Sequence, residues 1–133
     1  MRALLIAAAA LALAACADEP PPPAAVAPPP PADERVPVAR VTGLEVGRTR
    51  TGFVLAALGE AEGTGWRAAS LRPAREGLAP DGYLEFEFVA IPPATPGPGA
   101  QRLRADAPLP PEALTGAAGL RVIARDGDAE GFF

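Results

Sequence analysis

The stretch that decides the fold is YLEFEFVAI, residues 83–91. Apolar and charged side chains alternate along it, so Leu84, Phe86 and Phe88 would share one face of a strand. The two glutamates between them would share the opposite face. This period of two predicts a half-buried β-strand with its glutamates in solvent. The dipeptide DG before it and PP after it set its ends.

Other segments show weaker strand patterns between Gly- and Pro-rich turns. By periodicity alone, residues 53–58 fit a short buried helix as well as a strand, and the flanking glycines favour the strand. The remaining segments are 38–50, interpreted as one long bent strand or two short ones with a candidate bulge at Gly43, and 66–71, 101–107 and 120–125. Residues 111–114, PEAL, are the one expected helical turn. The layout predicts an all-β domain, either a small antiparallel β-sandwich or an open barrel of six to seven strands. A tryptophan strand followed by the strand at 83–91 resembles immunoglobulin and fibronectin type III modules.

Composition excludes several kinds of chemistry. The 133 residues include 12 arginines, 16 acidic residues and neither histidine nor lysine. Histidine-dependent triads and histidine-ligated zinc are therefore impossible. Cys16 is the only cysteine, so the chain can form neither an internal disulfide nor a cysteine-rich zinc site. The net charge of −4 gives no basic footprint for nucleic acid, which is not an expected partner.

The amino-terminal segment has the pattern of a secretory signal peptide. Arg2 supplies a positive charge, and residues 3–13 form an apolar run that is too short to cross a bilayer. The run ends in Leu13-Ala14-Ala15-Cys16, which resembles the lipobox of bacterial lipoproteins.

This resemblance implies that a diacylglyceryl group is attached to the Cys16 thiol. The lipoprotein signal peptidase would recognise Leu13, Ala14 and Ala15, remove residues 1–15, and leave an amino terminus that is then acylated. No cofactor is expected beyond this covalent lipid. Ala17 directly after the cysteine implies the periplasmic face of the outer membrane. The alternative is a free Cys16 thiol that follows an ordinary secretory cleavage site and pairs with another molecule.

Residues 16–37 are expected to form the lipidated cysteine and a proline-rich tether, ahead of a β-sandwich domain at residues 38–133. Nine of the 18 prolines fall between Pro20 and Pro37. Such a segment adopts polyproline II and reaches roughly 50 Å. The same prolines satisfy the P-x-x-P pattern of ligands for aromatic grooves, but composition alone produces that pattern, so a spacer is favoured.

Two acidic patterns are candidate sites. Glu85 and Glu87 would lie roughly 6.5 to 7 Å apart on one strand face, as a glycosidase pair could, although a solvated face is favoured. Residues 126–130, DGDAE, are similar to the start of a calcium loop, although an acidic turn is favoured. No metal site is expected.

A binding surface is the remaining candidate site. Trp66 and Tyr83, with Arg102 and Arg104 nearby, would suit a ligand, and core packing of the two aromatics is the alternative. Arginines also recur in pairs, which would form a basic stripe if their strands were neighbours, or pair across strands with Glu45, Glu85 and Glu87 on a solvated face. The pairs are Arg48 and Arg50, Arg102 and Arg104, and Arg121 and Arg125. Phe132 and Phe133 would either cap the core or form a small apolar patch.

The sequence thus predicts a non-enzymatic lipoprotein, an interaction or accessory module of the cell envelope. The alternative is a lipoprotein that binds a small ligand, a glycan or peptidoglycan. Its expected partners are the membrane, through the lipid anchor, and an envelope protein or glycan. The layout is similar to small, uncharacterised β-rich lipoproteins of GC-rich Gram-negative bacteria, a likeness that implies location but no activity. An enzyme would have to be a metal- or carboxylate-dependent hydrolase.

Overall fold

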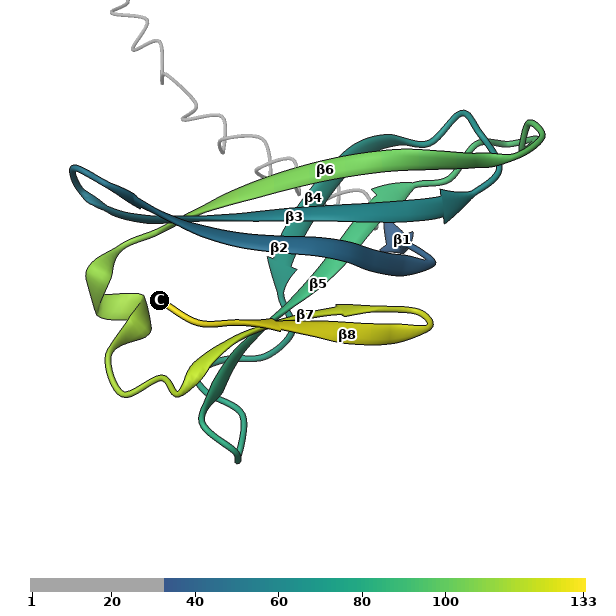
Figure 1. Ribbon diagram of the computed structural model, residues 1–133. Coiled ribbons are helices and arrows are strands. Elements are labelled where there is room, and N and C mark those ends of the chain that lie inside the picture. Colours follow the sequence, from purple (N-terminus) through teal and green to yellow (C-terminus); the bar gives the residue numbers. More distant parts are fainter. Residues whose placement is uncertain (1–32) are drawn as a thin grey trace, which may run out of the picture. The chain divides into compact units, whose positions relative to one another are not determined.

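Short alternating segments form eight strands in two sheets in the computed structural model, which describes residues 33–133 (Figure 1). The larger sheet contains β1 (Val36–Pro37), β4 (Arg67–Pro73), β5 (Tyr83–Ile91), β7 (Gly119–Ala124) and β8 (Gly127–Gly131). The smaller sheet contains β2 (Arg40–Thr49), β3 (Gly52–Glu62) and β6 (Ala100–Leu109). The protein is therefore all-β, and its sheets form a small sandwich that is not closed into a barrel.

The strand at 83–91 lies at the centre of the larger sheet, as its alternation predicts. β4 pairs with one of its edges, while β7 and β1 share the other edge, and β8 pairs with β7. The β5 and β7 strands run parallel, unlike the antiparallel arrangement expected. The chain between them first passes through β6 in the other sheet, which is the crossover that a parallel pair requires.

The smaller sheet has the order β2-β3-β6 and is antiparallel throughout. Its register shifts between Val41 and Gly43, which confirms the predicted irregularity beside Gly43. Residues 53–58 form part of a strand, as favoured over a helix. The helical turn at Pro111–Leu114 is present as a 3₁₀ turn, η1.

The core lies between the inner faces of the two sheets. Phe88 and Leu120 come from the larger sheet and Leu55 from the smaller one, and all three are fully buried. They hold the sandwich together, because burying each large apolar side chain contributes about 1.5 to 3 kcal/mol.

The folded unit begins before the expected boundary at residue 38. Val36 and Pro37 were assigned to the tether, but they form β1 and pair with Ala90 and Val89. Asp33 accepts hydrogen bonds from Arg35 at 2.7 Å and from Arg72 at 3.1 Å. These bonds hold the pKa of Asp33 well below its ordinary value, and the hydrogen bond from Arg35 has the largest effect.

The expected signal peptide, the Leu13-Ala14-Ala15-Cys16 motif and the tether up to residue 32 lie outside the described residues. Within residues 33–133, no helix is long and apolar enough to cross a membrane.

Candidate functional site

The structure does not bring Trp66 and Tyr83 together on one platform. Tyr83 is the first residue of β5, whereas Trp66 directly precedes β4, where Arg67 pairs with Ile91 at the other end of β5. Tyr83 and Ile91, the two ends of β5, are eight residue steps or about 26 Å apart. The prediction that Trp66 and Tyr83 share one binding surface is therefore wrong.

Trp66 joins the two sheets at one edge of the sandwich. Its ring packs against the hydrophobic core, and its indole Nε1 donates to the Glu62 carbonyl oxygen at 2.9 Å. The Gln101 side chain accepts from the Trp66 backbone N–H and donates to its carbonyl, both at 2.9 Å. Trp66 is partly buried, its indole and backbone polar groups are bonded within the protein, and its ring packs against the core, which is closer to the predicted core packing than to an exposed platform.

Tyr83 lies under a guanidinium group at the opposite end of β5. The Arg121 guanidinium carbon is 4.4 Å from the centre of its ring, and Phe132 meets the ring edge-on at 6.3 Å. Loss of hydration and the neighbouring Glu130 carboxylate raise the pKa of Tyr83. This ring therefore belongs to a cluster of aromatic and charged side chains remote from Trp66.

Arg102 and Arg104 lie on the outer face of the smaller sheet. Their register places Arg102 opposite Glu60 and Arg104 opposite Leu58. Arg104 is paired with Asp106 at 3.1 Å. Arg102 makes no ion pair with any described residue, so its five N–H donors can bind a ligand.

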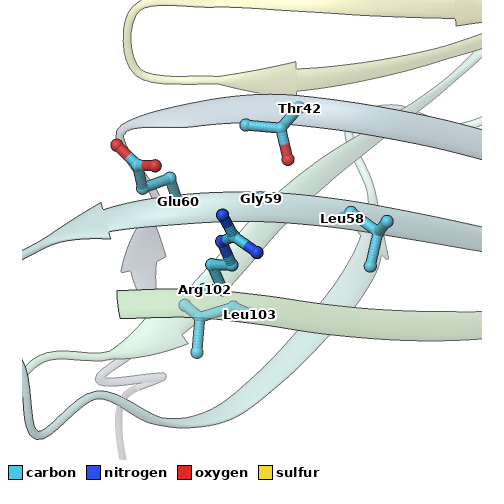
Figure 2. A pocket seen from close by; sticks show the side chains of 6 residues that line it. All are labelled: Thr42, Leu58, Gly59, Glu60, Arg102 and Leu103. Atoms are coloured by element: carbon cyan, nitrogen blue, oxygen red, sulfur yellow. The ribbon is translucent and has the colours of Figure 1, made fainter. Parts of the chain in front are cut away.

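A shallow hollow of about 340 Å³ adjoins Arg102 (Figure 2). Its polar groups are the Arg102 guanidinium, the Thr42 hydroxyl and the Glu60 carboxylate, which Arg40 holds at 2.8 Å. Thr42 is the extra residue at the irregularity in β2. The remaining lining residues are Leu58, Gly59 and Leu103.

The chemistry of this hollow suits binding. A guanidinium can hold a carboxylate, a carboxylate and a hydroxyl can bind sugar hydroxyls, and the exposed Leu58 offers apolar contact. Leu58 is 43 % exposed, so the hollow is open to solvent.

Glu85 and Glu87 do not form the solvated face that the sequence predicts. Glu85 is only 6 % exposed; it accepts a hydrogen bond from Arg121 at 2.8 Å and forms an ion pair with Arg75, also at 2.8 Å. Glu87 is half-buried and accepts from Arg72 at 2.7 Å. Arginines from neighbouring segments fold over this face of β5, a covering that strand alternation alone cannot reveal.

Arg121 is the centre of that arrangement. Besides Glu85 it contacts Asp81 at 2.7 Å, Glu130 at 2.8 Å and Asp128 at 3.2 Å. The hydrogen bond from Arg121 is the main reason that the pKa of Asp81 is lowered, and its carboxylate partners in turn raise the pKa of Arg121. The sequence predicts cross-strand pairing of arginines with Glu45, Glu85 and Glu87 on a solvated face, but it predicts neither this group around Arg121 nor the burial of Glu85.

The acidic segment at 126–130 is mostly a strand and not a turn. Asp128 and Glu130 lie on β8 and face Arg121, and Asp126 pairs with the adjacent Arg125 at 3.0 Å. Among residues 33–133, no group of three or more acidic side chains is placed to hold a metal ion.

The arginine pairs do not form one basic stripe. Arg121 faces outward from the larger sheet and Arg102 from the smaller one, while Arg48 lies over the Phe53 ring at 5.8 Å. Arg125 pairs with Glu62 at 2.8 Å. Glu87 takes Arg72, a partner not predicted for it.

No family model, no curated protein and no solved structure matches the chain.

Proposed function

We propose that this chain is a lipid-anchored protein of a bacterial cell envelope whose β-sandwich is a non-enzymatic interaction module. The observation that carries the proposal is the motif Leu13-Ala14-Ala15-Cys16 at the end of a short apolar run that follows the positively charged Arg2. Lipid on Cys16 would hold the domain at the periplasmic face of the outer membrane. Two or three acyl chains anchor a protein firmly, whereas one chain does so only marginally.

The architecture is compatible with this arrangement. The hydrophobic core described above is formed by side chains within residues 33–133. Residues 17–32 are then left as a proline-rich spacer between lipid and domain.

Replacing the anchor residue tests the proposal. Cys16→Ser should stop cleavage before residue 16 and move the protein out of the lipid-modified pool, as seen by metabolic labelling with a palmitate analogue. The matched control is Ser70→Cys introduced into Cys16→Ser, which restores one thiol at another position and should not restore labelling. Unchanged processing and membrane association in Cys16→Ser would refute the anchor.

Binding of a glycan or peptidoglycan fragment is a second candidate, favoured by the hollow beside Arg102. In pull-downs with soluble peptidoglycan fragments, Arg102→Gln should reduce retention about tenfold, because it removes the guanidinium that has no partner in the described residues. Arg104→Gln, on the same strand and face but paired with Asp106, should change retention less than about twofold. Equal retention by all three proteins would exclude the hollow beside Arg102 as the glycan site, and recovery of one abundant protein partner in place of glycan would assign the domain to protein interaction.

A further inference from the structure

Four of the seven aromatic side chains gather at one end of the sandwich, here called the aromatic end: Phe53, Tyr83, Phe132 and Phe133. Phe133 packs against Phe53 with ring centres 6.0 Å apart, and Phe132 packs against Tyr83 at 6.3 Å. Phe53 belongs to the smaller sheet and Tyr83 to the larger one, so the two C-terminal rings bridge the end of the molecule. Figure 1 shows the C-terminus between the two layers.

These rings do not complete the core. Phe132 is 67 % exposed and Phe133 is 50 % exposed, the highest values among the large apolar side chains described. A hollow of about 530 Å³ adjoins Phe53, and Val54 and Pro108 extend its apolar lining. The aromatic end is therefore an apolar surface with room beside it.

Unpaired positive charge borders this surface. Arg48 lies over the Phe53 ring at 5.8 Å, and Arg50 follows in the turn between β2 and β3. Neither makes an ion pair with any described residue. Asp81 and Glu130 lie beside Tyr83 and share the one guanidinium of Arg121 with Asp128.

We propose that the aromatic end docks on the surface of a bilayer that carries anionic headgroups, with Phe132 and Phe133 entering the interface and Arg48 and Arg50 contacting phosphate. Exposed phenylalanines beside arginines are the composition of segments that lie in a membrane interface. The inference rests on the proposed function, because a lipid on Cys16 would keep the domain within roughly 50 Å of the bilayer and so raise the local concentration of this surface.

A second copy of the chain fits this surface less well. The two exposed phenylalanines offer roughly 200 to 300 Å², whereas a stable dimer needs about 800 Å² from each partner. A weak contact that is reinforced by a tether needs no such area.

The test uses residues 16–133, which retain the whole described fold and carry Cys16 as their single cysteine. Cys16 is coupled to a maleimide lipid in vesicles of phosphatidylcholine, with or without one-third phosphatidylglycerol, and amide hydrogen exchange is followed at 48–54 and 128–133. On the anionic vesicles we expect about fivefold or greater slowing at both segments relative to the neutral vesicles.

Matched variants separate the aromatic end from other exposed apolar groups. Phe132→Ser with Phe133→Ser should abolish the slowing, and Arg48→Gln with Arg50→Gln should remove its dependence on phosphatidylglycerol. Leu58→Ser, at the exposed leucine on the outer face of the smaller sheet, should leave it unchanged. Circular dichroism should show that each variant is folded.

Absence of slowing in the parent protein, or equal slowing in the double phenylalanine variant, would overturn the proposal. Slowing that appears without vesicles and grows with protein concentration would also overturn it and assign the surface to a second copy. Because the coupling is chemical, a negative result leaves the proposed lipidation in cells untouched, and failure of lipidation in cells would not alter this result.

Discussion

The outer faces of the two sheets differ in how their charged side chains are used. On the larger sheet, arginines and carboxylates from β4, β5, β7 and β8 pair with one another and cover the strand surface, so that Glu85 is buried. The outer face of the smaller sheet carries Gly43, Gly47 and the exposed Leu58, and only a few of its charged side chains form ion pairs. Arg102 has no ion-pair partner among the described residues. One face is closed by its own charges, and the other remains available to a ligand.

The strongest way to break this contrast is to remove a carboxylate from each face. Glu85→Ala should lower the free energy of unfolding by about 3 kcal/mol, because it removes a buried carboxylate that accepts a hydrogen bond from Arg121 and forms an ion pair with Arg75. Glu60→Ala, which removes the partner of Arg40 on the smaller sheet, should cost less than about 0.5 kcal/mol. Urea unfolding of both variants provides the measurement, and equal losses would contradict the contrast.

Two glycines of the smaller sheet test how crowded its inner and outer faces are: Gly59 faces the core and Gly43 lies on the outer face. A Cβ at Gly59 would lie 2.5 Å from Phe88 Cε1 and 2.9 Å from the Arg40 carbonyl oxygen, so Gly59→Ala should cost about 2 kcal/mol. At Gly43 the nearest atom, Leu58 Cδ1, would lie at 3.4 Å, so Gly43→Ala should raise stability by about 0.5 kcal/mol.

Thermal unfolding of the two glycine variants makes this check. A Gly43→Ala variant as unstable as Gly59→Ala would mean that the outer face of the smaller sheet is as crowded as the core, and the hollow beside Arg102 would then be no binding surface.

Lowering the pH should have a smaller effect on the stability of the fold. The pKa of Asp33 is lowered chiefly by its bond from Arg35, and that of Asp81 by its bond from Arg121. A carboxyl group whose pKa is lower in the folded than in the unfolded protein stabilises the fold. That stabilisation is complete at pH values above the unfolded pKa of about 3.9, and it is lost as the pH falls through the folded-state pKa. Asp33→Asn should therefore flatten the fall in melting temperature between about pH 4 and pH 2. An unchanged slope would show that the bonds seen at Asp33 do not persist in solution.

The predictable part of the fold is the part that depends on local pattern. Alternation and flanking turns locate β5 at Tyr83–Ile91, and proline followed by good helix formers locates the turn at Pro111–Leu114. β8 was missed because its sequence, GDAEG, lacks the apolar and β-branched residues that signal a strand. Pairing with β7 and the bonds to Arg121 hold it in the sheet.

The candidate site was less predictable because it depends on which strands become neighbours. Arg102 was named as a binding residue, but its position opposite Glu60 and beside Thr42 follows from the register of three strands. Glu85 was expected in solvent because alternation shows which face a side chain takes and not what covers that face. The separation of Trp66 from Tyr83 likewise follows from the antiparallel pairing of β4 with β5.

Mass spectrometry of the amino terminus of the native protein, extracted from envelope membranes, tests the central claim most directly. The account predicts a first residue Cys16 that carries a diacylglyceryl thioether and an amide-linked acyl chain. A mature protein that begins at another residue, or a Cys16 with an unmodified thiol, would contradict it.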